Sequence, residues 1–361
     1  MSRYHWKIRL QRVLEEPDPP PGLRFLLTPL SMLAPLYGTG QRVRSWAYRH
    51  SLLAQHALPC KVISIGNLTL GGTGKTPFVA YLGRHFSQQG YRVVILSRGY
   101  GGKARQEVQV ISDGTSLLLH PPLAADEPYM LARKLPQIPV LCGKNRYRVG
   151  MYAVRHFSPD LVLLDDGFQH LSLHRDCNIL LIDSTVSLDK ARLFPRGTLR
   201  EPLDAIGRAD ILILTRVEGP PSPDLLALLR RYNPKAPLYQ SRYRPQALFQ
   251  VDEQRSLPLE MLQGTPVLAF CGIAHPEPFF TLIASLGGKV VDTVAFPDHH
   301  WYERTEVSAL IRQAQERGAV ALVTTEKDGA RLFPYLPLSF PVWELRIAVT
   351  INDPAWWEAV L

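Results

Sequence analysis

Cysteine is scarce in this sequence, and its spacing limits the kinds of site that the chain can form. The four cysteines lie far apart, at Cys60, Cys142, Cys177 and Cys271, with no Cys-x-x-Cys pair. This spacing indicates neither a zinc site nor a disulfide framework, and it favours a reducing cytosol.

Long apolar runs are also missing. The longest apolar stretch, residues 23–37, is interrupted by Arg24 and two prolines. A spanning helix needs roughly 20 apolar residues, so this stretch is too short to cross a bilayer. The preceding residues have Trp6, Leu10, Val13 and Leu14 at helical spacing, without the apolar core and cleavage site of a signal peptide.

The residues after the apolar stretch are basic and aromatic. Arg42, Arg44 and Arg49 alternate with Trp46 and Tyr48. This pattern suits a segment that lies in the interface of an anionic leaflet, and it equally suits a helix packed on the protein's own core. We predict an N-terminal arm over residues 1–58 and leave both alternatives open.

Acidic residues are fewer than basic ones, and the formal net charge is +9. A basic chain favours an acidic partner, which can be nucleic acid, anionic lipid or a phosphorylated substrate. Charge alone does not choose among them.

From residue 60 onward, short β-branched runs alternate with amphipathic stretches. Strands are predicted over 61–66, 92–97, 139–142, 160–166, 178–183 and 210–215, with helices over 76–89 and 146–157. This alternation predicts an α/β fold with a mostly parallel sheet and helices on both faces. Ligands in such sheets bind beyond the carboxyl ends of the strands.

Proline-rich stretches near residue 220 and over 231–246 interrupt this pattern, and a hinge between two units is expected near residues 220 or 245. Further strands are predicted over 266–273, 289–296 and 319–325, with helices over 276–286 and 304–317. We therefore predict one domain over residues 59–240 and a second, smaller α/β domain over residues 241–361.

A glycine-rich loop separates the first predicted strand from the helix that follows. Its residues are Thr69, Leu70, Gly71, Gly72, Thr73, Gly74, Lys75 and Thr76. Its end matches a phosphate-binding P-loop, in which backbone N–H groups hold phosphate oxygens, the lysine reaches the β- and γ-phosphates and the threonine ligates Mg²⁺. The strict pattern has a glycine where this chain has Thr69.

An acidic pair follows a later buried strand. Asp165 and Asp166 end the run "LVLLDD", where carboxylates of P-loop proteins hold Mg²⁺. Together with the loop, this pair predicts a site for a nucleoside triphosphate and Mg²⁺.

Seven strings narrow the interpretation. They are "GNLTLGGTGKTP" (66–77), "SRGYGG" (97–102), "DEP" (126–128), "DDGFQH" (165–170), "GTLREP" (197–202), "FPDHHW" (296–301) and "TEKD" (325–328). In this order they resemble the tetraacyldisaccharide 4′-kinases of lipid A biosynthesis, and the N-terminal arm resembles that family's membrane-associating segment.

The resemblance implies a P-loop kinase that uses ATP and Mg²⁺ to phosphorylate the 4′-hydroxyl of a tetraacylated disaccharide 1-phosphate, giving lipid IVA. It implies a membrane-embedded lipid substrate and an anionic membrane surface as partners, at the cytoplasmic face of the inner membrane. Neither nucleic acid nor an obligate protein partner is inferred.

The resemblance also implies roles for single residues. Lys75 and Thr76 would hold phosphate and Mg²⁺, and Asp165 and Asp166 would bind the metal. Asp126 matches the family's proposed base, and His299 matches the residue that pairs with it, although His300 is a rival. Arg200 and Glu201 match a pair near the active site: arginine suits a phosphoryl group, and Glu201 would serve Mg²⁺ or anchor Arg200.

Two other classes of protein share parts of the pattern. A ParA/MinD-like membrane-associated ATPase switch has a related loop, but Leu70 stands in place of its extra lysine. A nucleic-acid-dependent NTPase would need basic and aromatic residues near the carboxyl edge of the sheet, whereas the basic-aromatic cluster lies in the N-terminal arm.

Overall fold

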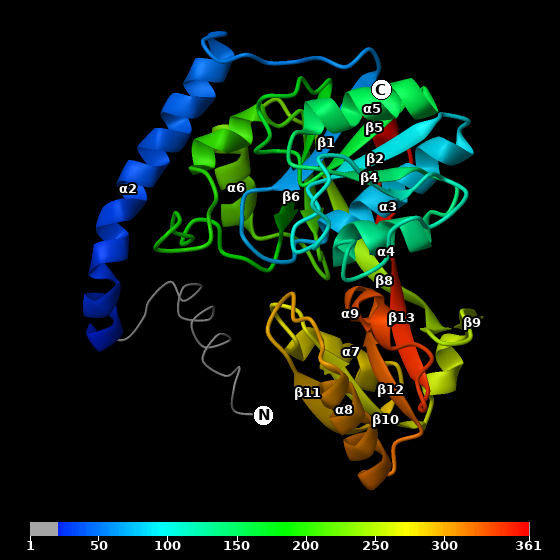
Figure 1. Cartoon of the computed structure of the whole chain (residues 1–361). Helices are drawn as coiled ribbons and strands as arrows, with labels where there is room; N and C mark the ends of the chain where they lie inside the picture. Colours follow the sequence, from blue (N-terminus) through cyan, green and yellow to red (C-terminus); the bar gives the residue numbers. More distant parts are fainter. Residues whose placement is uncertain (1–20, 361) are drawn as a thin grey trace.

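The computed structural model describes residues 21–360, and residues 1–20 and 361 are not described. A long helix, α2 (Pro21–Arg49), precedes two α/β units that lie one above the other in Figure 1. The helical pattern predicted for Trp6, Leu10, Val13 and Leu14 lies outside the described residues.

The first unit contains the predicted strands and helices of the P-loop region. Its strands are β1 (Lys61–Asn67), β2 (Val93–Ser97), β3 (Gln109–Ser112), β4 (Val140–Cys142), β5 (Leu161–Asp165), β6 (Cys177–Asp183) and β7 (Ile211–Thr215). Its helices are α3 (Lys75–Gln88), α4 (Asp126–Lys134), α5 (Arg146–Phe157), η1 (Leu203–Arg208) and α6 (Pro223–Tyr232).

The second unit is smaller. It is built from β10 (Pro266–Cys271), α7 (Glu277–Ser285), β11 (Lys289–Ala295), α8 (Arg304–Glu316), β12 (Ala321–Thr325), α9 (Glu326–Leu332) and η3 (Phe333–Tyr335). Between and after the units come β8 (Leu238–Gln250), β9 (Arg255–Leu257), η2 (Leu259–Leu262), β13 (Val342–Ile351) and η4 (Trp356–Ala359).

The strands of both units form one path of neighbours. Its order is β11-β10-β12-β13-β8-β7-β6-β1-β5-β2-β4-β3, with β9 paired to β8. All neighbours pair in parallel except β3 with β4, β13 with β8 and β9 with β8. The mostly parallel sheet that the sequence predicted is confirmed.

Alternate residues of the central strands face opposite layers of helices. In β1, Ile63 and Ile65 pack in the same cluster as Phe78 of α3, whereas Val62 packs with Val149 of α5. This alternation follows from the period of two in a strand, and it places helices on both faces of the sheet. The second unit repeats the arrangement, with α8 on one face and α7 on the other.

The proline-rich segment 231–246, one of the two places where a hinge is expected, contains a strand that the sequence analysis does not predict. Much of it belongs to β8, whose first residues pair with β7 and whose later residues pair with β13. Pro245 is accommodated where the β8–β13 register shifts, between Arg346 and Ile347, because a proline has no N–H to offer a regular ladder. The predicted boundary at residues 240 and 241 falls inside this strand.

The end of the chain returns to the first unit. Trp356 is 1% exposed and lies in the same cluster as the α3 side chains, with its ring near Phe78 and Tyr81. Residues from both sides of the predicted division at 240 therefore share one core. The division into two domains stays a prediction.

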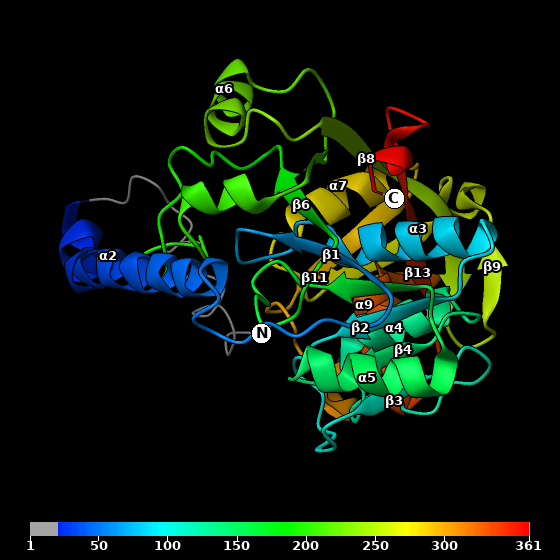
Figure 2. The same ribbon diagram turned by 90° about the horizontal axis from the view of Figure 1, so that it is seen from above.

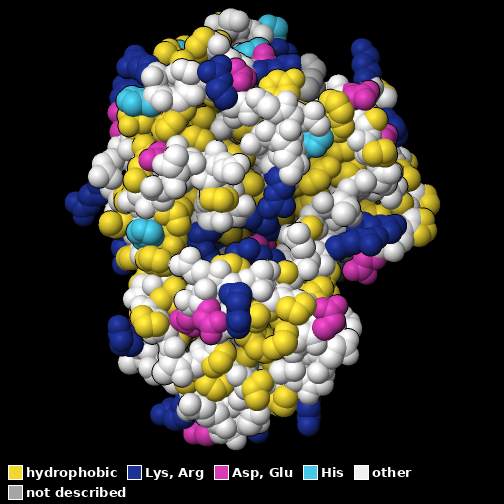
Figure 3. All heavy atoms as spheres, turned by 90° about the vertical axis from the view of Figure 1, so that its right-hand side faces the viewer, with side chains coloured by type: hydrophobic (Ala, Val, Ile, Leu, Met, Phe, Trp, Pro, Cys, Tyr) yellow, Lys and Arg dark blue, Asp and Glu magenta, His cyan; other side chains and the backbone are white. Residues whose placement is uncertain are grey.

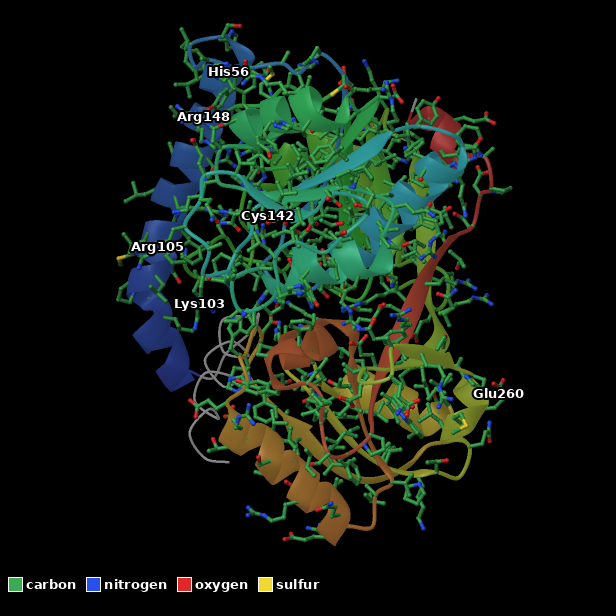
Figure 4. The ribbon with its side chains drawn as sticks, turned by 45° about the vertical axis from the view of Figure 1, so that its right-hand side comes forward. His56, Lys103, Arg105, Cys142, Arg148 and Glu260 are labelled. Atoms are coloured by element: carbon green, nitrogen blue, oxygen red, sulfur yellow. The ribbon has the colours of Figure 1, made fainter. Side chains whose placement is uncertain are left out.

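All four cysteines are free. Cys142 lies in the interior of the first unit, among the side chains of the sheet (Figure 4). Burial raises the pKa of its thiol, so this thiol stays protonated and unreactive.

Helix α2 runs along one side of the first unit (Figures 1 and 2). Its later residues contact that unit: the Tyr37 hydroxyl donates to the Arg200 carbonyl, Arg42 pairs with Asp204, and Arg44 donates to the Gln169 carbonyl. Across residues 21–360, no helix combines the length and the apolar character needed to span a membrane.

We predict that Trp356→Ala lowers the free energy of unfolding by about 3–5 kcal/mol, because it removes a buried aromatic ring from the core of the first unit. Urea unfolding followed by circular dichroism measures this change. Leu118→Ala is the control, since Leu118 is 53% exposed and should change stability by less than about 0.5 kcal/mol. Equal losses in both variants would contradict the packing described here.

Candidate active site

The P-loop and the acidic pair meet because their strands are neighbours. Strand β1 pairs in parallel with β5, and Ile65 lies opposite Asp165. Parallel strands end at the same edge of a sheet, so the loop after β1 and the two aspartates after β5 share that edge.

A cleft of about 2000 Å³ lies beside this edge and is lined by residues from α2 and from both units. Lys75, Asp166 and Arg200 line it from the first unit, and Asp298, His299 and Lys327 line it from the second. On the face shown in Figure 3, the surface is indented between the two units, and basic side chains gather in this indentation.

The loop has positive φ at Gly71 and Gly74. A Cβ at Gly71 or Gly72 would meet nothing within 4 Å, so this stretch of backbone is open to a ligand. Thr69, in contrast, is bridged to Leu199 in an antiparallel arrangement, and this extended conformation needs no glycine. The departure from the strict pattern therefore leaves the rest of the loop intact.

Lys75 and Thr76 begin α3, directly after Gly74. The Lys75 Nζ atom lies 3.1 Å from Asn67 Oδ1 and 3.5 Å from Asp166 Oδ1. The helix N-terminus adds a favourable field for anions at this point. Lys75 therefore carries its charge to the edge that holds the acidic pair, and Thr76 lines the same cleft.

Asp166 and Arg200 form an ion pair in the cleft. Arg200 Nη1 donates to both carboxylate oxygens of Asp166, at 2.9 and 2.8 Å. Burial opposes ionisation of Asp166, but the charges of Lys75 and Arg200 outweigh it and lower its pKa to about 2. Asp166 therefore stays ionised at every working pH.

Asp165 is buried beside this pair in a different state. Ser97 donates to its Oδ2 at 3.3 Å, and within the described part of the chain its Oδ1 has no hydrogen-bond partner. Burial, followed by the charges of Glu127 and Asp166, raises its pKa to about 7. A buried carboxylate oxygen without a donor fits a cation, because a cation would both pair it and favour its ionised form.

Residues 21–360 hold no group of three His, Cys, Asp or Glu side chains arranged as a metal site. A metal at this edge would find oxygen donors in the Thr76 hydroxyl and the Asp165 and Asp166 carboxylates. Mg²⁺ prefers such oxygen ligands and takes its remaining ligands from water and phosphate.

Asp126 and His299 meet across the two units. Asp126 begins α4, and its Oδ2 lies 3.2 Å from His299 Nδ1. Lys327 Nζ lies 3.0 Å from the other ring nitrogen of His299. An ammonium can only donate, so His299 Nε2 accepts and Nδ1 carries the proton that is donated to Asp126.

Within this pair, His299 lines the cleft and Asp126 lies behind it, 3% exposed. The buried Arg331 side chain also donates to Asp126 through Nε and Nη2. Burial opposes ionisation of Asp126, but the hydrogen bond from His299 and the charges of Arg331 and Lys327 hold its pKa below the ordinary value.

Two predicted candidates lie elsewhere. The Glu201 carboxylate pairs with Arg208 at 2.8 and 2.9 Å, where the Arg208 guanidinium lies over the Phe168 ring, so the structure brings Glu201 to neither the acidic pair nor Arg200. His300 is also turned away, with its Nε2 2.8 Å from Glu306 Oε2. Of the two histidines, His299 is the one beside Asp126.

Sequence reasoning missed several residues that surround the site. Arg331 lies outside the seven strings, and Lys327 lies inside "TEKD" without a predicted role. Tyr243, Thr215 and Arg216 contact the backbone of the P-loop. A sequence signal for Arg331 was available, since it is a basic residue three positions after Asp328, whereas Tyr243 lies in a proline-rich stretch where no strand is predicted.

Comparison with known proteins shows the family to which this chain belongs. The family model described as "Tetraacyldisaccharide-1-P 4'-kinase" matches residues 23–361. The tetraacyldisaccharide 4′-kinase of Syntrophus aciditrophicus is 40% identical over 356 residues, covering 95% of this chain and 94% of that protein. The one from Geobacter sulfurreducens is 40% identical over 338 residues, covering 94% and 93%.

A solved structure agrees over almost the whole chain. The crystal structure of LpxK from Aquifex aeolicus in complex with ATP has a TM-score of 0.76 and 33% sequence identity, covering 93% of this chain and 98% of that one. These matches favour a kinase over a ParA/MinD-like switch. The chain belongs to the tetraacyldisaccharide 4′-kinase family of ATP-dependent lipid kinases.

Proposed function

We propose that this protein transfers the γ-phosphoryl group of ATP to the 4′-hydroxyl of a tetraacyldisaccharide 1-phosphate, giving lipid IVA, at the cytoplasmic face of an inner membrane. The bond from the γ-phosphorus to ADP breaks, a bond to the sugar oxygen forms, and the hydroxyl loses its proton. The observation that carries the proposal is the meeting of the P-loop, the Asp166–Arg200 pair and the Asp126–His299 pair around one cleft.

The phosphate side of the reaction belongs to the first unit. The open backbone of Gly71 and Gly72 holds phosphate oxygens, and Lys75 supplies a positive charge at the β- and γ-phosphates. Arg200, fixed by Asp166, faces the same space and stabilises the charge of the phosphoryl group in transfer.

Thr76, Asp165 and Asp166 would hold Mg²⁺. When bound, the ion neutralises phosphate charge and orients the triphosphate. Asp165 supplies its free oxygen to the ion, while Asp166 also keeps Lys75 and Arg200 in place.

The acceptor side depends on the Asp126–His299 pair. His299 faces the cleft. In this scheme the sugar hydroxyl takes the place of Lys327 at the His299 Nε2 atom and gives its proton to that nitrogen, while Asp126 stabilises the resulting imidazolium through the Nδ1 hydrogen bond. Lys327 and Arg331 fix the orientation of both side chains. Glu201 supports the site only through its ion pair with Arg208 in this scheme.

The exposed face of α2 supports the membrane assignment. Met32, Leu33, Leu36, Val43 and Trp46 are between 50 and 70% exposed. At 100° per residue they fall on one side of the helix, opposite the side of Leu27 and Ala34, which are buried. We assign this apolar face to the membrane interface, where the lipid substrate resides.

We predict that wild-type protein moves label from γ-labelled ATP into the lipid disaccharide 1-phosphate, and that two substitutions prevent this. Lys75→Ala should lower turnover by about 10²–10³-fold, because it removes a charge aimed at the transferred group. Asp126→Asn should lower it by about 10²–10⁴-fold while ATP affinity changes little.

Lys235→Ala and Asp224→Asn are the matched controls, since both residues are exposed and should leave turnover unchanged. Label that appears only as free phosphate, regardless of the lipid, would contradict the proposed reaction.

Asp165 gives a pH-dependent prediction for metal-free protein. Its pKa rises from 3.8 in the unfolded chain to about 7 in the folded one, so the folded state holds the extra proton between these values. Stability should therefore fall as pH rises from about 4 to 7. Asp165→Asn cannot ionise and should lose this part of the pH slope.

Urea unfolding at pH 5 and pH 8 in the presence of a chelator measures the slope. Added Mg²⁺ should restore stability at pH 8 in the wild type more than in Asp165→Asn. The same slope in both proteins would show that Asp165 does not carry the extra proton.

The α2 face is tested by replacing Leu33, Leu36, Val43 and Trp46 together with serine. We expect the variant to float with anionic vesicles much less than the wild type, because its apolar area at the interface is lost. ATP affinity should not change, since the contacts of Tyr37 and Arg44 with the first unit remain. Leu118→Ser with Leu123→Ser is the control, and equal flotation of all three proteins would defeat the assignment.

A further inference from the structure

Side chains from outside the P-loop donate hydrogen bonds to its backbone carbonyl groups. These side chains are not part of the P-loop sequence motif. Arg216 Nη2 donates to the Gly72 carbonyl at 2.6 Å, and Thr215 Oγ1 donates to the Thr73 carbonyl at 3.2 Å. The Tyr243 hydroxyl lies 3.3 Å from the carbonyl oxygens of both Thr73 and Gly74. The Gly72 and Thr73 carbonyl groups thereby accept from side chains outside the loop, and the Gly74 carbonyl, which also accepts from the Phe78 N–H of α3, gains a second donor.

These contacts bear on phosphate binding. A P-loop binds anions because its N–H groups converge on one point, so the carbonyl groups must point elsewhere and find donors there. The donors at Thr215 and Arg216 come from the end of β7, and Asp183 holds Arg216 in place at 2.9 Å. The third donor, Tyr243, comes from β8.

Tyr243 lies at a special place in the fold. It follows the part of β8 that pairs with β7 in the first unit, and its own backbone pairs with Val349 of β13. Its hydroxyl packs so closely on Gly74 that a Cβ at that glycine would lie 1.6 Å from the oxygen. Gly74 also has a φ of +80°, so both backbone conformation and space require glycine there.

From this geometry we infer that Tyr243 is a positioning residue for nucleotide binding, which holds the end of the P-loop in its phosphate-binding conformation from the strand that joins the two units. The inference rests on the proposed function, since it assumes that this loop receives the phosphates of ATP. Burial raises the pKa of the Tyr243 hydroxyl, so it remains a donor at working pH.

The test is Tyr243→Phe in the full-length protein, which removes one donor and keeps the ring. The KM for ATP should rise about three- to tenfold, as expected for the loss of one hydrogen bond to the loop. The KM for the lipid, the kcat and the melting temperature should stay at wild-type values. Inhibition by AMP should also stay unchanged, because AMP lacks the β- and γ-phosphates that the loop holds.

Tyr239→Phe is the matched control, since Tyr239 lies on the same strand and packs near Trp356. Arg216→Met should raise the KM for ATP in the same direction as Tyr243→Phe. An unchanged KM for ATP in Tyr243→Phe would overturn the inference, and so would equal rises in the KM values for ATP and lipid with a lower melting temperature. Absence of lipid phosphorylation in the wild type would instead defeat the proposed function itself.

Discussion

The parallel pairing of β1 with β5 is the constraint on which the site depends. It sets Ile65 beside Asp165, so the P-loop after one strand and the acidic pair after the other are brought to one edge. Residues 198–200 then pair with residues 68–70, which places Arg200 against Asp166. A loop that binds phosphate, a cation site and an arginine for the transferred group all follow from these backbone pairings.

The acceptor side depends on the contact between the two units. Helix α4 of the first unit is tied to β13 by the ion pair Arg133–Glu344, and to α9 of the second unit by the ion pairs Lys134–Glu326 and Arg331–Asp126, all buried or nearly buried. Buried ion pairs contribute little net stability, but breaking one leaves an unpaired charge, so they fix relative positions strongly. His299 and Asp126, which are 173 residues apart in the chain, meet because of this docking.

Much of the fold was predictable because its signals are local. The predicted strands from 61–66 to 210–215 all form, and so do the helices near 76–89, 146–157 and 304–317, since apolar periodicity specifies them. Strand β8 was not predicted because prolines interrupt its strand pattern and because its partner β13 lies far away in sequence. The P-loop and Asp165–Asp166 were predictable from spacing, whereas the positions of Arg331 and Tyr243 and the pairing of the buried Glu201 with Arg208 depend on tertiary contacts that no local pattern encodes.

The central claim is that groups from two units direct a phosphoryl group from the P-loop to one sugar hydroxyl. The most direct measurement is tandem mass spectrometry of the lipid product, which locates the new phosphate on the disaccharide. The account predicts a phosphomonoester at the 4′-position beside the unchanged 1-phosphate. A 1-diphosphate, or a phosphate spread over several hydroxyl groups, would contradict it.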